Sequence, residues 1–259
     1  MELIHPIFKW LHVIAGIMWI GLLYFFNFVN TAFAPTMDGD TKKKVVPELM
    51  PRTLYWFRWG AAWTWVTGVI LLAVVYYHGG LTFDDPESSY GLPFFVMVAI
   101  TFLGVFAYDA LYKSPVASNL PVVTAISFIL LSIIIFIMKD WAGFSYRTFN
   151  MHLGALFGTN MAFNVWFRIW PAQQNIITAI KNGDTPDGEL LALAGLRSKH
   201  NTYMSVPLIW TMHNQHHVTV PTALGIPAEF SWLLPMAIVA LGWHIVWQLY
   251  KKSGTIEGF

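Results

Sequence analysis

RSKHNTYMSVPLIWTMHNQHH, residues 197–217, joins a basic, polar start to an apolar middle and a cluster of histidines. Polar groups at membrane depth are unfavourable unless they serve a function. His213, His216 and His217 are spaced i, i+3, i+4, so a helix would place them on one face. Pro207 lies between the two polar ends and should kink the helix. We expect this segment to contain the sixth of seven membrane-spanning helices.

The composition of the whole chain points to a polytopic membrane protein. Of its 259 residues, 56% are hydrophobic and only 11% are charged, against about 25% in an average soluble domain. Several apolar runs reach the roughly 20 residues that a spanning helix needs. The net charge of +1 gives no reason to expect a nucleic-acid partner. The chain has no cysteine, which excludes disulfides, thiolate-bound iron–sulfur clusters and covalently attached c-type haem and leaves histidine as the main ligand.

The expected fold is all-α, a single membrane domain over residues 1–259 with seven transmembrane helices. These helices are expected at residues 6–33, 54–77, 93–112, 120–138, 148–170, 201–218 and 228–250. Pro35, Pro47 and Pro51 predict a loop over residues 35–54, and Pro171 should end the fifth helix. Residues 172–199 are expected to form an amphipathic hairpin on the cytoplasmic face.

The distribution of basic residues predicts the orientation. With the N-terminus outside, the outer side would hold only Lys9, Lys139 and Arg147, and the inner side the other twelve of the 15 Lys and Arg residues. Cytoplasmic loops carry such an excess of positive charge. The expected topology is therefore N-outside and C-inside in the lipid bilayer.

Two helical stripes carry the candidate cofactor ligands. His12 and Gly16 lie on one face of the first helix, where the glycine would let a neighbouring backbone or a flat ligand come close. Asn27 and Asn30 continue that stripe and are expected to cross-link helices. His152 lies on a similar stripe of the fifth helix. An ionisable group in a spanning segment is a functional candidate by default.

Histidines on facing membrane helices are what a haem b needs as axial ligands. The candidate ligands of a haem or a metal are His12 and His152, with His216 as the competing one. The same set could bind copper or zinc. The alternative for histidines near the membrane surface is that they tolerate the headgroup region without binding anything. Spacing does not separate these possibilities.

Arg197, His200, Asn201 and Tyr203 form the polar start of the sixth helix. We expect them to build a second, catalytic or binding site on the inner side. Its ligand would be a substrate, a quinone or a partner subunit.

Three runs of this sequence resemble a known family. They are WLHVIAGIMWIG (residues 10–21), HLGALFGTNMAFNVWF followed by IWPAQ (residues 152–173), and RSKHNTY (residues 197–203). They resemble the membrane domain of PuuD-type urate hydroxylases, the urate oxidase N-terminal family. The resemblance covers nearly the whole chain. It implies an integral-membrane oxidoreductase of the bacterial inner membrane that passes electrons to a cytochrome c. Carried over by position, it favours His12, His152, His200 and His216.

The sequence also departs from that family's pattern, in which an eighth helix and a c-type cytochrome domain follow. Here the sequence ends after the seventh expected helix and has no cysteine, so we expect a separate cytochrome c-type acceptor. His213 and His217 look like additions. If the protein is catalytic, a small heterocycle such as urate would be its substrate. The alternative is a non-catalytic electron-relay or scaffold subunit of a respiratory or photosynthetic membrane complex. A solute transporter is less supported, because Asp109 is the one clear mid-chain carboxylate and there is no inverted repeat.

Overall fold

The computed structural model describes residues 3–85, 87–214 and 216–256. The chain divides into two compact units. Unit 1 comprises Met1–Gly68, Met161–Val206 and Gly242–Phe259, and unit 2 comprises Val69–Asn160 and Pro207–Leu241.

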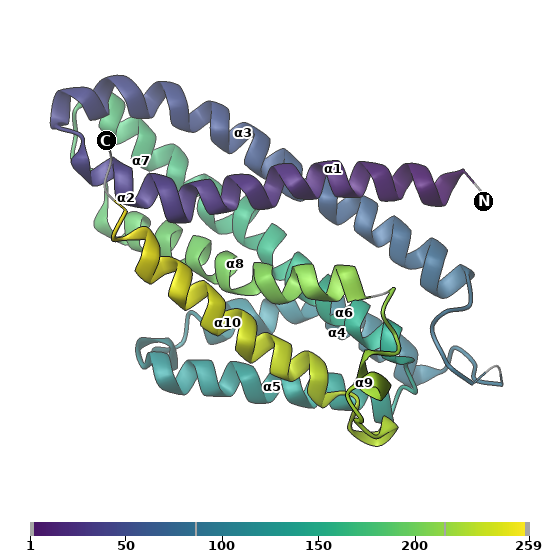
Figure 1. The fold of residues 1–259 in the computed structure, drawn as a ribbon. Helices are drawn as coiled ribbons and strands as arrows, with labels where there is room; N and C mark the ends of the chain where they lie inside the picture. Colours follow the sequence, from purple (N-terminus) through teal and green to yellow (C-terminus); the bar gives the residue numbers. More distant parts are fainter. Residues whose placement is uncertain (1–2, 86, 215, 257–259) are drawn as a thin grey trace. The chain divides into compact units, whose positions relative to one another are not determined.

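Figure 1 shows the helices in chain order, with a longer connection over residues 79–91 between η3 and α4. The segments η1, η3 and η5 are π-helical, and η2, η4 and η6 are 3₁₀-helical. In order, the elements are α1 (Ile4–Tyr24), η1 (Phe25–Asn30), α2 (Thr31–Phe33), η2 (Ala34–Thr36), α3 (Gly39–Leu71), η3 (Leu72–His78), α4 (Leu92–Leu111), η4 (Pro115–Ser118), α5 (Leu120–Asp140), α6 (Tyr146–Asn164), η5 (Val165–Ile169), α7 (Trp170–Asn182), α8 (Gly188–Asn214), α9 (Val220–Ala223), η6 (Ala228–Phe230) and α10 (Leu233–Ser253).

The expected loop over residues 35–54 is wrong, because α3 already begins at Gly39 and continues through Pro47 and Pro51. The helix begins before the prolines because Asp38 caps its N-terminus. The carboxylate of Asp38 accepts hydrogen bonds from the Thr41 amide at 2.8 Å and the Thr41 hydroxyl at 2.9 Å. These bonds stabilise the charged form and lower the pKa of Asp38.

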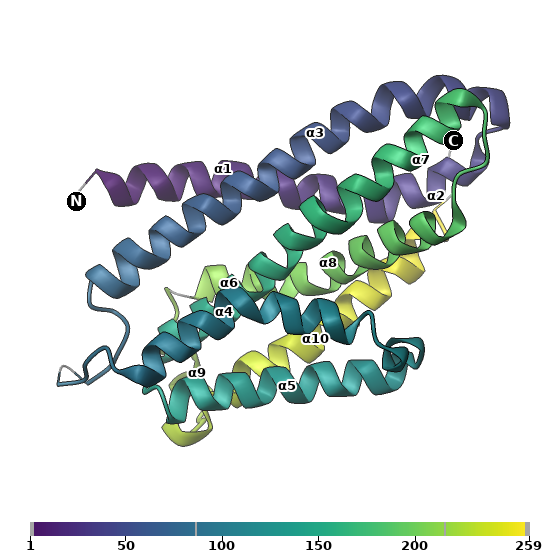
Figure 2. The same ribbon diagram turned by 180° about the vertical axis from the view of Figure 1, so that it is seen from behind.

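The region 172–199 is more helical than expected. Pro171 does not end the fifth helix, because the chain continues as a helix through α6, the π-helical η5 and α7, in which Pro171 is the second residue. α7 ends at Gly183, whose φ of +85° is the left-handed conformation that favours glycine. α8 then starts at Gly188. Within unit 1, the two helices form a hairpin in which Ile176 packs near Ala194 (Figure 2).

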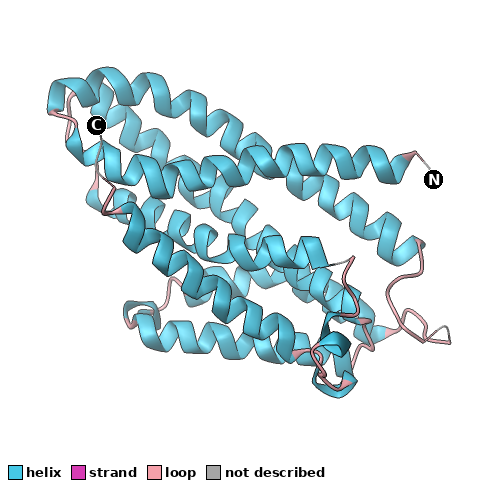
Figure 3. Cartoon of the chain, in the orientation of Figure 1, coloured by secondary structure: helices cyan, strands magenta, loops and turns pink. Residues whose placement is uncertain are grey.

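Within the described residues all regular elements are helical, and the β-type pairing is confined to an isolated bridge between Phe83 and Phe144 (Figure 3). The all-α class is thereby confirmed. Five segments of the described chain are long and apolar enough to cross a membrane: Ile4–Thr36, Gly39–His78, Leu92–Leu111, Leu120–Asp140 and Ala228–Ser253. Large apolar side chains such as Ile17 and Phe106 are exposed on these helices, as lipid-facing residues are.

The remaining two expected spans are helical as well, but they are more polar. α6 buries Asn150, Asn160 and Asn164, and α8 buries Arg197. Neither passes the same test of length and hydropathy. The seven-span count and its orientation therefore stay predictions.

Candidate functional site

His12 lies half-buried on α1 in unit 1. Its Nδ1 atom is 3.1 Å from Oγ1 of Thr67 on α3. The Thr67 hydroxyl donates its hydrogen to the Trp63 carbonyl at 2.6 Å, so Nδ1 of His12 carries the hydrogen in the His12–Thr67 bond. In the neutral imidazole, Nε2 then presents a lone pair. This is the state of the ring that ligates haem iron or a metal ion.

The space for this imidazole is provided by Gly68. A Cβ atom at Gly68 would lie 3.0 Å from Cε1 of His12. Gly16, which the sequence singled out, is not where helices approach most closely: a Cβ there would meet Cγ2 of Thr64 at 3.9 Å. That approach occurs at Gly60, where a Cβ would lie 3.2 Å from the Trp19 amide nitrogen. The expected role of Gly16 beside a flat ligand stays a prediction.

His152 lies fully buried on α6 in unit 2. Its Nδ1 atom is 2.8 Å from the Thr148 carbonyl oxygen. A carbonyl can only accept, so Nδ1 carries the hydrogen and Nε2 has the lone pair. That lone pair accepts a hydrogen bond from the Tyr77 hydroxyl at 2.9 Å. The rings of Phe144 and Tyr77 lie against the imidazole, with centroid distances of 4.7 and 5.8 Å.

The tautomer of His152, with its hydrogen on Nδ1, therefore fits an axial ligand. Its ligating atom, Nε2, however, already accepts a hydrogen bond. Tyr77 would have to give up this hydrogen bond before iron or another metal could bind Nε2. Tyr77 is not among the expected site residues. It lies in the π-helical segment η3, whose wider turn changes the facing of each side chain. π-Helical turns are frequent at functional sites.

His216 is exposed in the turn that follows α8. The rings of His213 and His217 contact each other, with centroids 5.0 Å apart. Among the described residues, no three His, Asp or Glu side chains form a group that could hold a metal ion. His12 belongs to unit 1, whereas His152 and His216 belong to unit 2. The pairing of these histidines around one cofactor stays a prediction.

The four expected residues of the inner site lie on α8 in unit 1. Arg197 and Asn201 are almost completely buried, at 1% and 0% exposure, and His200 is half-buried. Asn201 donates to the Met161 carbonyl at 3.0 Å and accepts from the Asn164 amide at 2.9 Å. It therefore links α8 to the end of α6. Tyr203 stacks on Tyr250, with centroids 6.0 Å apart and an interplanar angle of 23°.

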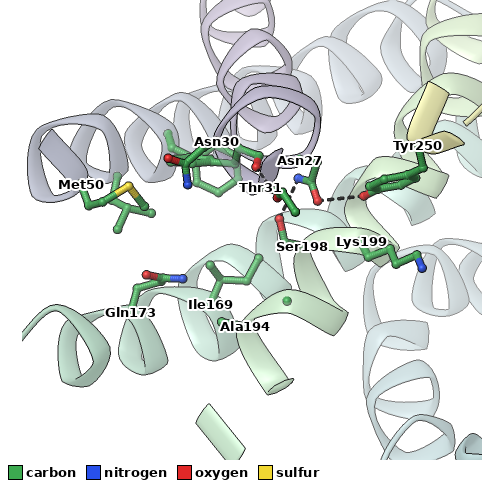
Figure 4. Close-up of a pocket in the computed structure, with 14 residues that line it drawn as sticks. Asn27, Asn30, Thr31, Met50, Ile169, Gln173, Ala194, Ser198, Lys199 and Tyr250 are labelled. Atoms are coloured by element: carbon green, nitrogen blue, oxygen red, sulfur yellow. Dashed lines mark hydrogen bonds between the residues drawn. The ribbon is translucent and has the colours of Figure 1, made fainter. Parts of the chain in front are cut away.

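A pocket of about 370 Å³ lies beside this cluster in unit 1 (Figure 4). Its lining residues come from η1, α2, α3, η5, α7, α8 and α10. Asn27 connects three of these elements: it donates to the Ser198 hydroxyl oxygen and accepts from the Tyr250 hydroxyl, both at 2.8 Å. The expectation that Asn27 cross-links helices is confirmed. Asn30 instead faces the pocket (Figure 4).

None of Arg197, His200, Asn201 and Tyr203 is among the pocket's lining residues, although their neighbours Ser198 and Lys199 are. Successive residues of a helix point about 100° apart, so a polar run divides between faces. The expected inner site and this pocket therefore share a turn of α8 but no residue, and the inner site stays a prediction. The Asn27 and Asn30 stripe on the first helix was the signal that could have found the pocket.

The comparisons with known proteins agree with the resemblance seen in the sequence. No curated protein and no solved structure gives a significant match to this chain. The family model described as urate oxidase N-terminal matches residues 1–256. With nearly the whole chain matched, the protein belongs to the urate oxidase N-terminal family.

Proposed function

We propose that this protein is a membrane-embedded redox protein of the urate hydroxylase type that binds haem b through His12 and His152. Family membership supports a urate hydroxylase-like membrane domain. The observation that carries the haem assignment is the shared state of the two rings. In each imidazole, Nδ1 is hydrogen-bonded to a threonine oxygen, the hydroxyl of Thr67 or the carbonyl of Thr148, and Nε2 has a lone pair.

A bound haem b would supply one-electron chemistry that no side chain of this chain offers. The residues of the chain would hold it. Thr67 and the Thr148 carbonyl fix the orientation of the two imidazoles, as the outer partners of ligating histidines commonly do. Gly68 leaves room for the His12 ring, and Tyr77 releases Nε2 of His152. Copper or zinc bound by His12, His152 or His216 is the alternative.

In this proposal the chain crosses a bacterial inner membrane seven times with its N-terminus outside. It takes electrons from a small heterocycle such as urate and passes them to a separate cytochrome c-type acceptor. The site for the substrate would include four residues of α8: Arg197, His200, Asn201 and Tyr203. The buried state of Arg197 and Asn201 supports a role in positioning, because neither side chain is open to solvent.

The test uses the full chain purified in detergent, with haem quantified per polypeptide and urate-dependent reduction of cytochrome c measured on the same sample. His12→Ala and His152→Ala should each lose bound haem and the reduction of cytochrome c. His78→Ala is the control, since His78 is exposed at the end of η3. Full haem content in His12→Ala would remove His12 as a ligand.

The second candidate is a non-catalytic electron-relay or scaffold subunit of a larger membrane complex. The exposed, mutually contacting rings of His213 and His217 favour it, because they offer a surface for another protein. Co-purification of a large complex, combined with no urate turnover by the isolated chain, would select this function over the first.

A further inference from the structure

The pocket in unit 1 has an aromatic floor. Phe57 is buried at 1% exposure, and the Phe26 ring meets it edge-on with the centroids 5.2 Å apart. Leu54 and Met50 extend this apolar side, and both are buried. At about 370 Å³ the cavity falls within the usual range of small-molecule sites, roughly 300–1,000 Å³. Its floor suits a flat, apolar ring.

The polar side of the pocket holds two side-chain carboxamides that are available for hydrogen bonds to a ligand. Asn30 and Gln173 are half-buried, and neither side chain makes a hydrogen bond to another described residue. A carboxamide has both a donor and an acceptor and can be turned either way, so each can donate to an oxygen of a ligand. Ser198 adds a hydroxyl whose oxygen already accepts from Asn27 at 2.8 Å, which leaves its hydrogen for an acceptor.

The charge of the pocket limits its ligand further. The 14 residues that line it include Lys199 but no Asp or Glu. The Lys199 ammonium lies 5.4 Å from the centroid of the Tyr250 ring. A cation has no counter-charge here, whereas oxygen acceptors find several donors. The site is therefore built for a ring that carries carbonyl or hydroxyl oxygens.

We propose that this pocket binds the head group of a lipid-soluble quinone. The ring would lie on Phe26 and Phe57, and its carbonyl oxygens would accept hydrogen bonds from Asn30 and Gln173. A purine fits less well, because polar atoms surround its whole edge and those facing Leu54 and Met50 would lack partners. The binding step involves no electron transfer and does not depend on the proposed haem.

The test measures binding of a decyl-substituted benzoquinone to the detergent-purified full chain by isothermal titration calorimetry. Gln173→Leu should weaken binding at least about tenfold, since it removes a hydrogen-bond donor and keeps the side-chain volume similar. Gln174→Leu is the matched control on the same helix, because Gln174 is exposed and does not line the pocket. It should bind as the unmodified chain does.

Gly195→Leu supplies a second variant. Gly195 borders the pocket, and a Cβ there would meet no atom within 4 Å, so the backbone accepts a side chain at this position and leucine should occupy the space of the ligand. Decylbenzene has the same ten-carbon tail but no carbonyl oxygens, so it tests whether the apolar part of the ligand is enough for binding. No saturable quinone binding, equal binding by Gln173→Leu and Gln174→Leu, or equal affinity for decylbenzene would each overturn the proposal. Haem content measured on the same samples tests the proposed redox function separately, so a failure of quinone binding can be told apart from a failure of haem binding.

Discussion

At Gly68 the backbone leaves the space that the imidazole of His12 occupies. A methyl group there would stand 3.0 Å from Cε1 of His12, a contact that folded proteins rarely contain. To relieve it the His12 ring would have to shift, and a shift away from position 68 would strain its bond to Thr67. The orientation of the His12 ring therefore depends on a residue 56 positions away in the sequence.

We expect Gly68→Ala to lower haem content at least several-fold while the protein stays folded, because alanine is the better helix former by about 1 kcal/mol. Haem per chain, measured with helicity by circular dichroism, checks this. Gly16→Ala is the matched control, since its Cβ meets only Thr64 Cγ2 at 3.9 Å. Equal haem loss in both variants would contradict the account of Gly68.

Tyr77 competes with a ligand for Nε2 of His152, because its hydroxyl bonds that atom at 2.9 Å. Tyr77→Phe removes the competing donor and keeps the ring. We expect haem to bind this variant as tightly as, or up to about tenfold more tightly than, the original chain, since the net value of one such bond is about 0.5–1.5 kcal/mol. Haem titration into the haem-free protein measures it. Weaker binding would mean that the hydroxyl belongs to the cofactor site instead.

The residue types at these sites could be predicted from the sequence, but their partners could not. His12 and His152 stand out because ionisable groups in apolar helices are rare. The partners of the histidines are residue types that are common in such helices: Thr67, Gly68, Tyr77 and Thr148. Only the direction in which each helix faces brings them to the histidines. The same reason explains why Ser198, and not its neighbour Arg197, borders the pocket.

At the scale of elements, α1 and α3 of unit 1 meet where Gly60 faces Ala15 and Trp19. A Cβ at Gly60 would lie 3.3 Å from the Ala15 carbonyl oxygen and 3.2 Å from the Trp19 amide nitrogen. Because backbone atoms cannot move aside like a side-chain tip, the two helices would have to separate. Small residues allow this kind of close packing in membranes.

Gly60→Ala should destabilise the protein by roughly 1–3 kcal/mol, the usual range for overpacking a close contact. Gly21→Ala, also on a helix of unit 1, has no atom within 4 Å of the added Cβ and should be neutral or slightly stabilising. Thermal unfolding of both variants in the same detergent compares them. A Gly60→Ala protein as stable as the original would show that α1 and α3 pack less closely than described.

Element boundaries were harder to predict than the elements themselves. The apolar runs located α4 and α5 to within two residues. The start of α3 was missed because Pro47 and Pro51 outweighed the Asp38 cap in the sequence pattern. The π-helical segments were not predicted, because η1, η3 and η5 consist mostly of apolar residues, among which a shift of the helical phase has few polar markers.

For the whole molecule, the topology depends on whether α6 and α8 cross the membrane. Both are helical, yet buried Asn164 and Arg197 make them more polar than the five apolar segments. If all seven cross with the N-terminus outside, the turn between α7 and α8 lies inside. If only the five apolar segments cross, the same turn lies outside.

The chain has no cysteine, so single cysteines can report this directly. We expect Thr185→Cys, exposed in the turn between α7 and α8, to resist a membrane-impermeant maleimide in intact cells and to react after lysis. Ser88→Cys, exposed before α4, should react in intact cells under either topology and serves as the positive control. Labelling of Thr185→Cys in intact cells would contradict seven spans.

The proposed redox function requires that this member of the urate oxidase N-terminal family holds a haem b. The most direct measurement is an oxidised-minus-reduced absorption spectrum of the purified protein, with metal analysis of the same sample. We predict a b-type haem signal that is lost in His12→Ala and His152→Ala and kept in His78→Ala. A purified, folded protein with neither haem nor bound metal would contradict the redox function and leave the scaffold subunit as the better account.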